Sequence, residues 1–220
     1  MATDLHLVIG NKAYSSWSLR PWIAMKVAGL AFRETVICLK RDDTTAEIQK
    51  YSAAGKVPVL IHGDNTVWES LAILEYLAEA FYDRHWWPTD PQARATARAI
   101  SAEMHAGFTT LRANMTMNVR RALPGRGRAP GVDADIARIT AIWRDARHRF
   151  GSGGSFLFGA FSNADAMYAP VVTRFKTYAV DLDPVCQAYC DAVLALPAMQ
   201  DWYAAGAREP WIIEAYELAD

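Results

Sequence analysis

The chain has 220 residues, of which 52% are apolar, and it carries 23 basic against 24 acidic side chains. A chain of this length and composition buries a substantial core and folds as one large domain or two small ones. The near-neutral charge gives no general attraction to nucleic acid or to an anionic membrane, so we expect a small ligand and neither of those partners.

The cysteines and the first residues of the chain indicate the compartment of the protein and whether disulfides or a metal site are expected. No apolar run approaches the length of a membrane span, and MATDLHLVIGNK has no basic region followed by a cleavage site, so we expect a cytoplasmic protein. Cys38, Cys186 and Cys190 lack the spacing of a disulfide framework or a zinc site, and no metal is expected.

The first 80 or so residues alternate strand and helix patterns. Residues 5–9 alternate as a strand does, and Pro21 is expected to begin a helix that ends near Gly29. After these come a strand (FRETVICL), a weak helix (TTAEIQKYSAA), two antiparallel strands (KVPVLIH and TVWE) around the turn GDN, and a helix (SLAILEYLAEAF). The predicted order is β-α-β-α-β-β-α.

The rest of the chain is almost wholly helical in pattern. After a proline-containing linker at residues 83–91, one long helix is predicted along a stripe of apolar residues, ending at Pro124. The stripe consists of Ile100, Met104, Phe108, Leu111, Met115 and Val119. Another helix is predicted over residues 133–150, and Ser162 with Asp165 predicts a capping box that begins one of two or three more. We therefore expect an α/β domain over residues 1–82 and an all-helical domain over residues 91–220.

Two motifs in the first half suit a peptide-like ligand. Pro58 stands at the start of a predicted strand, where it either follows a cis bond that exposes the Val57 backbone for pairing or is an ordinary trans proline at a sheet edge. Glu69 can accept hydrogen bonds from an ammonium group, while Ser70 and the helix start can hold a carboxylate. Taken alone, this Glu-Ser pair is more often a simple helix cap.

Together, GKVPVL, WESLAILEYLAE, the element order, the helical second half and SNAD resemble the glutathione transferase family over essentially the whole chain. The resemblance implies a thioredoxin-like first domain that binds glutathione as co-substrate and pairs its cysteinyl backbone with the residue before a cis-proline. These positions are Val57 and Pro58 in this sequence. It also implies a homodimer with the active site near the subunit interface.

The turn YSSWSLRPW holds no cysteine, which excludes a dithiol reaction there. SSWSLR resembles the SSCSWR motif of the zeta class, which includes maleylacetoacetate isomerase, and this implies that Ser15 faces the ligand sulfur with Ser16 beside it. Tyr14 is the alternative donor, because other classes of the family use a tyrosine. Lowering a thiol pKa by about two units stabilises the thiolate by roughly 2.7 kcal/mol, which one charge-assisted hydrogen bond and a helix start can supply.

The remaining candidates complete a site for glutathione and an electrophile. Lys40 and Lys56 are the candidate partners of the glycine carboxylate. The expected electrophile pocket consists of Trp17, Met104, His105, Phe108 and Arg112, and the basic residues from Arg112 onward favour an anionic co-substrate. Trp17 and Leu19 depart from the zeta motif. Three functions stay open: a transferase, a maleylacetoacetate or maleylpyruvate isomerase, and a non-catalytic binding module.

Overall fold

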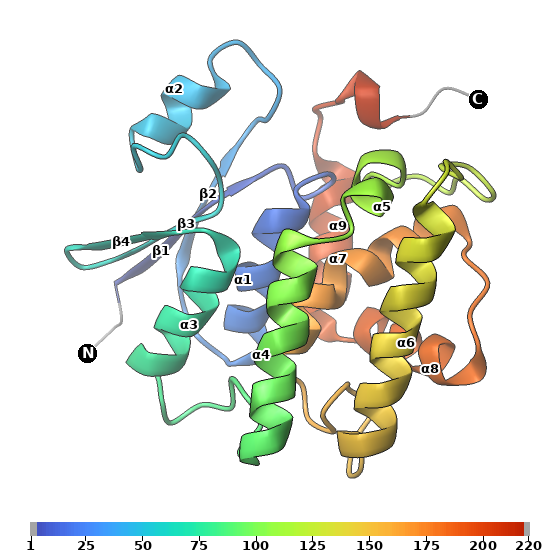
Figure 1. Ribbon diagram of the computed structural model, residues 1–220. Helices are drawn as coiled ribbons and strands as arrows, with labels where there is room; N and C mark the ends of the chain where they lie inside the picture. The colour runs from blue at the N-terminus through green and yellow to red at the C-terminus, as the bar shows by residue number, and fades with distance from the viewer. Residues whose placement is uncertain (1–3, 218–220) are drawn as a thin grey trace.

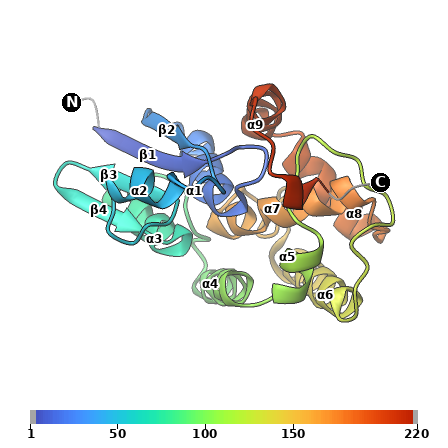
Figure 2. The same cartoon turned by 90° about the horizontal axis from the view of Figure 1, so that it is seen from above.

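The computed structural model describes residues 4–217. A four-stranded sheet lies on one side of the molecule and the helices of the second half lie on the other (Figures 1 and 2). The strands are β1 (Leu5–Gly10), β2 (Arg33–Ile37), β3 (Val59–His62) and β4 (Asn65–Trp68), in the order β2-β1-β3-β4. β1 pairs with β2 in parallel and with β3 antiparallel, and β3 pairs with β4 antiparallel.

Helices cover both faces of the sheet. Because side chains alternate along β1, Leu7 and Ile9 join the core formed with α1 (Ser16–Val27) and α3 (Ser70–Ala80). Val8 points to the other face, where it packs with Ile48 of α2 (Thr44–Gln49). This arrangement is the thioredoxin-like first domain, and its element order confirms the predicted one.

The second half is helical within the described residues. Its helices are α4 (Pro91–Ala106), α5 (Thr109–Asn114), α6 (Val132–Phe150), α7 (Asn163–Tyr178), α8 (Pro184–Leu194) and α9 (Pro197–Arg208), followed by a short 3-10 helix, Glu214–Tyr216. α7 is buried over nearly its whole length and packs against α1 and α4. One apolar core therefore runs through both halves, and the boundaries 1–82 and 91–220 stay predictions.

Two predicted helices differ from the structure. α1 begins at Ser16 rather than at Pro21, which lies inside it. Burial of Leu19, Trp22 and Ile23 on both sides of the proline outweighs the hydrogen bond that the proline cannot donate. α1 is followed by Ala28 as its cap, close to the predicted end at Gly29.

The predicted long helix through the apolar stripe breaks after Ala106. Phe108 has a φ of 56°, in the left-handed region, and a side chain at Gly107 would place its Cβ 2.8 Å from the Glu103 carbonyl oxygen. The stripe is buried as predicted, but it is shared between α4, α5 and the loop that follows.

The helix predicted over residues 133–150 and the capping box are confirmed. The carboxylate of Asp165 accepts from the backbone N–H of Ser162 at 2.8 Å and of Leu157 at 3.0 Å. Among residues 4–217, no helix combines the length and apolarity that crossing a bilayer requires, and no cluster of side chains suits a metal ion.

Candidate active site

The turn between β1 and α1 presents two serine hydroxyls at a helix start. The backbone N–H groups of Tyr14 and Ser15 both donate to the Asn11 carbonyl, at 3.1 and 2.8 Å, and α1 then begins without a side-chain cap. Ser15 Oγ donates to Ser18 Oγ at 2.7 Å, and Ser18 Oγ accepts from the Gly10 N–H at 3.0 Å. The open helix start favours negative charge next to these hydroxyls.

Two adjoining pockets lie at this turn. The first, which we call the serine pocket, has a volume of about 190 Å³ and is lined by Tyr14, Ser15, Ser16, Trp17, Leu39, Arg112, Thr116, Met117, Arg174 and Tyr216. The second, the proline pocket, has a volume of about 240 Å³ and is lined by Trp17, Lys56, Val57, Pro58, Trp68 and Glu69. Trp17 lines both and forms the wall between them.

The proline pocket unites the peptide-binding candidates. The Val57–Pro58 peptide bond is cis, as one of the two alternatives predicted. Glu69 precedes α3 with a φ of 68°, and its side chain is half exposed at the pocket. Ser70 is fully buried at the first position of α3. The Glu69 carboxylate and the Val57–Pro58 segment thus line one recess, and Ser70, which follows Glu69, is not among its lining residues.

Three arginines surround Trp17 and the serine pocket. The guanidinium groups of Arg20 and Arg112 lie 4.2 and 5.2 Å from the centre of the Trp17 ring. Arg174 lines the serine pocket while its Nε donates to the Met115 carbonyl at 2.8 Å. Within the part of the chain described, none of these three groups forms a salt bridge within 4 Å, and each donates to a backbone carbonyl. The charge of Asp135 acts on Arg112 from a greater distance, so this wall keeps a net positive charge.

The burial of these arginines weakens but does not remove their charge. Burial, together with the charges of Arg174 and Arg112, lowers the pKa of Arg20 to about 9. Burial and the charge of Arg112 likewise lower the pKa of Arg174 to about 10. Both groups remain protonated at neutral pH.

His105 connects the helical half to the peptide-binding recess. Its Nε2 lies 3.7 Å from Glu69 Oε2, and its ring meets the Trp17 ring edge to face at 5.2 Å. Burial and the charge of Arg20 lower the pKa of His105 despite the opposing effect of Glu69. A neutral imidazole therefore faces the carboxylate at neutral pH.

Tyr14 is engaged elsewhere. Its hydroxyl donates to Glu217 Oε1 and accepts from Arg120 Nη2 at 2.6 Å and from the Ile213 N–H at 3.3 Å. Burial and the bond to Glu217 raise the pKa of Tyr14. The Tyr14 hydroxyl thus holds residues 213–217, while Tyr14 itself lines the serine pocket, and its role as a donor to a ligand thiol stays a prediction.

Three further candidates lie away from the pockets. Met104 is completely buried and Phe108 nearly so, because both pack in the core that α4 shares with α6 and α7. Their predicted place in the electrophile pocket is corrected accordingly. Lys40 is exposed and lines neither pocket, whereas Lys56 lines the proline pocket.

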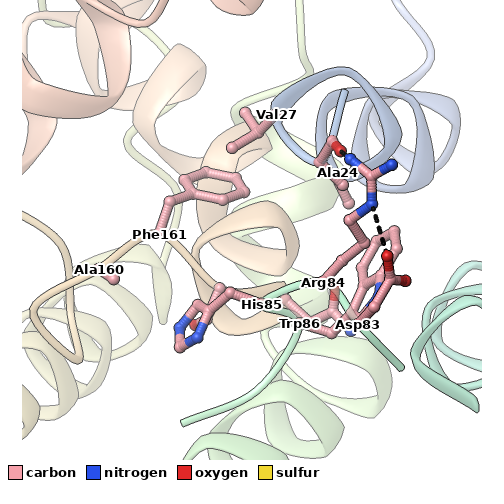
Figure 3. A pocket seen from close by; sticks show the side chains of 11 residues that line it. Ala24, Val27, Asp83, Arg84, His85, Trp86, Ala160 and Phe161 are labelled. Carbon is pink, nitrogen blue, oxygen red and sulfur yellow. Dashed lines mark hydrogen bonds and ion pairs between the residues drawn. The ribbon is translucent and has the colours of Figure 1, made fainter. Parts of the chain in front are cut away.

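A third cavity, larger than the serine and proline pockets, lies away from these residues. It has a volume of about 410 Å³ and lies between the C-terminal half of α1, residues 83–86 and residues 160–163. In Figure 3, Phe161 faces Val27, and Arg84 pairs with Asp83 at 3.6 Å. Ser15 lies at the other end of α1, so this cavity plays no part in the site.

Comparison with known proteins identifies the family. A sequence model of the glutathione S-transferase N-terminal domain matches residues 14–80, and one of the C-terminal domain matches residues 129–205. Maleylacetoacetate isomerase of Rattus norvegicus is 30% identical over 193 residues, covering 84% of this chain and 87% of that protein. The chain belongs to the glutathione S-transferase family.

Other relatives of the glutathione S-transferase family match less of the chain or match its fold alone. A probable maleylacetoacetate isomerase of Caenorhabditis elegans is 34% identical over 97 residues, which cover 44% of this chain and 45% of that protein. A crystal structure of a Burkholderia glutathione transferase homologue with bound glutathione superposes with a TM-score of 0.69 at 22% identity, covering 92% of this chain and 98% of that one. At that identity it supports the shared fold.

Several residues of this site were not predicted from the sequence, among them Arg174 and Tyr216. Arg174 lies in α7, where it interrupts the apolar run VVTRF, and Tyr216 lies near the end of the described chain. A single arginine within a buried helix is a signal that could have been found, because such a charge needs a partner or a ligand. Tyr216 offers no comparable signal in the sequence.

Proposed function

We propose that this protein is a glutathione transferase that binds glutathione in the proline pocket and ionises its thiol at Ser15 and Ser16. The observation that carries this proposal is the shared wall at Trp17, which puts the peptide-binding recess next to the serine hydroxyls. The membership of the glutathione S-transferase family supports the same ligand.

The chemistry of the recess matches the parts of glutathione. Glu69 accepts hydrogen bonds from the α-ammonium group. The N-terminus of α3, which begins at the buried Ser70 directly after Glu69, favours the neighbouring carboxylate through the helix dipole. The backbone of Val57, exposed by the cis bond, pairs with the cysteinyl backbone. Lys56 is the cation in this pocket for the glycine carboxylate.

The thiol is activated by a pair of hydroxyls. Hydroxyl protons rotate, so Ser18 can donate to Ser15 and thereby release the Ser15 proton to a thiolate, while the Gly10 N–H continues to support Ser18. Ser16 offers a second hydroxyl at the first position of α1. The thiol proton first passes to solvent. The thiolate then attacks an electrophilic carbon, a sulfur–carbon bond forms, and the bond from that carbon to its leaving group breaks, so that the leaving group departs to solvent with the electron pair, as a halide ion does from an aryl halide.

The serine pocket favours an anionic electrophile. Arg112 and Arg174 line it, and among residues 4–217 neither is paired with a carboxylate; both donate to backbone carbonyls. A carboxylate on the co-substrate would pair with these guanidinium groups through charge-assisted hydrogen bonds. The transferase therefore acts on an electrophile that carries an apolar body and at least one acidic group.

An isomerase is the second candidate function. The rat relative is a maleylacetoacetate isomerase, and a cis-dienoic diacid such as maleylacetoacetate or maleylpyruvate would meet the same arginine wall. Assays with such diacids and with aryl halides separate the two functions, because an isomerase leaves glutathione unconsumed. A protein that binds glutathione but converts neither class would contradict both and would leave only a binding module.

The proposal extends to the organisation of the protein. We propose that residues 1–82 hold the glutathione site, that residues 91–220 supply the electrophile wall, and that two copies associate as a homodimer in the cytoplasm. The support is the family membership and the position of Arg112 and Arg174 in the helical half.

A further inference from the structure

The residue that follows α9 returns to the turn that carries the serines. Glu209 Oε1 accepts from the Lys12 backbone N–H at 2.7 Å, and Oε2 accepts from the Ala13 N–H at 2.9 Å. Both oxygens of one carboxylate thus hold two successive amides, 196 residues away in the sequence. These amides directly precede Tyr14 and the serines.

The same turn is held from a second direction. The Val119 N–H donates to the Ala13 carbonyl at 3.1 Å. α9 approaches the turn at Gly206, where a Cβ would lie 3.1 Å from the Ala13 nitrogen. Arg120 Nη1 donates to the Glu209 carbonyl at 2.8 Å and so fixes the backbone that carries the carboxylate.

The carboxylate suits this place because of its charge. Burial raises the pKa of Glu209, while the Ala13 and Lys12 amides and the charge of Arg120 favour its ionised form. Ionised, Glu209 presents a separate acceptor oxygen to each amide, whereas glutamine at this position would have a single acceptor oxygen.

We propose that Glu209 is a positioning residue for thiol activation, fixing the Lys12 and Ala13 amides and thereby the turn that presents Ser15 and Ser16. This inference rests on the proposed function. Residues 11–15 form a turn in which the Tyr14 and Ser15 N–H groups donate to the Asn11 carbonyl. Because Ala13 lies within this turn, a shift of its backbone moves Ser15 relative to the glutathione sulfur. A displacement of about 1 Å is enough to weaken such a contact severely.

A purely structural role predicts a different outcome. In that case Glu209 would only dock α9, as Trp202 does against Trp22, and its loss would lower the melting temperature alone. Trp202→Phe is therefore a matched control, since it weakens the docking of α9 and leaves the carboxylate in place. Glu214→Ala is a second control, because Glu214 is an exposed acid on the same segment.

The test compares the pH profile of kcat/KM and the ultraviolet titration of bound glutathione in Glu209→Ala, Glu209→Asp and both controls. We expect Glu209→Ala to lower kcat/KM about tenfold at neutral pH. The increase of kcat/KM with pH should occur about one pH unit higher than in the parent, because a tenfold loss of thiolate corresponds to a thiol pKa higher by one unit. Glu209→Asp, which keeps the carboxylate, should recover part of this loss, and both controls should keep the parent profile.

The inference is overturned if Glu209→Ala melts at a lower temperature but keeps the parent pH profile. If Glu209→Ala does not fold, Glu209→Gln, which retains one acceptor oxygen, must show the same displacement or the inference fails. Failure of the proposed function looks different, since the parent protein itself would then leave the thiol of bound glutathione with its ordinary pKa.

Discussion

At the scale of single residues, the Ser15 hydroxyl is hydrogen-bonded to the hydroxyl of a second serine, Ser18. The Ser15–Ser18 hydrogen bond of 2.7 Å positions the Ser15 oxygen before any ligand arrives, and the Gly10 N–H completes this short chain. The oxygen of Ser15 is thus fixed in place, and its proton becomes available to a thiolate when Ser18 reverses the hydrogen bond between the two hydroxyls.

We predict that Ser15→Ala lowers kcat/KM for glutathione-dependent turnover by about tenfold to a hundredfold, because it removes one hydrogen bond to a charged sulfur. Steady-state kinetics across pH measure this, with Ser52→Ala as control, a buried serine that lines neither pocket. A full loss in Ser16→Ala with parent activity in Ser15→Ala would reverse the roles of the two serines.

Arg112 carries the second prediction at this scale. Arg112→Gln should raise KM for an anionic electrophile by about tenfold, the loss of one charged contact, and leave KM for a neutral electrophile nearly unchanged. Arg138→Gln is the matched control, because Arg138 is an exposed arginine paired with Glu103. Equal losses for both electrophiles would show that Arg112 supports the fold of the pocket and not the charge of its ligand.

At the scale of elements, some helix ends depend on contacts between residues that are close in the sequence, and others depend on packing against residues that are far away in it. The capping box at Ser162 and Asp165 lies within four residues, so the sequence predicts it. The start of α1 at Ser16 depends on the burial of Leu19 and Ile23, and the break at Gly107 depends on the left-handed Phe108. Packing decides both, and local patterns do not contain it.

The start of α8 provides a prediction about stability. Asp183 accepts from the N–H groups of Val185 and Cys186 and from Arg144 Nη1 at 2.8 Å. Burial opposes ionisation of this carboxylate, but these bonds outweigh it and lower its pKa to about 2. Since the folded pKa lies below the unfolded one, the stabilisation is present above about pH 4 and is lost as the pH falls toward 2.

Asp183→Ala should therefore lower the free energy of unfolding by about 1 kcal/mol at pH 7. Urea unfolding at pH 7 and at pH 3 measures the effect, and the difference from the parent should shrink at pH 3. Asp181→Ala, an exposed acid two residues earlier, is the control. An equal difference at both pH values would contradict the role assigned to the ionised cap.

At the scale of the whole molecule, residues distant in sequence meet around one helix end. The sequence predicts the element order, the antiparallel pair of strands, the cis-proline alternative, Glu69, Ser70 and the serines, because these lie in short motifs of the first half. It does not predict Arg174, Tyr216 or Glu209, which reach the same turn from α7 and from the end of the chain. Their placement depends on how the helices dock, which no local pattern records.

Association of two copies is the prediction at this scale. We expect the protein to sediment at twice the mass of one chain at micromolar concentration, because the family membership implies a homodimer. Analytical ultracentrifugation over a hundredfold range of concentration is the measurement. A single species with the mass of one chain throughout that range would contradict the expected dimer.

The central claim is that the turn before α1 keeps the sulfur of bound glutathione ionised. Ultraviolet difference titration of the thiolate in the complex of the parent protein with glutathione tests it most directly. We expect an apparent thiol pKa about two units below that of free glutathione in the parent complex, and a pKa most of the way back to that of free glutathione in Ser15→Ala. A bound thiol that titrates like free glutathione in the parent protein would contradict it.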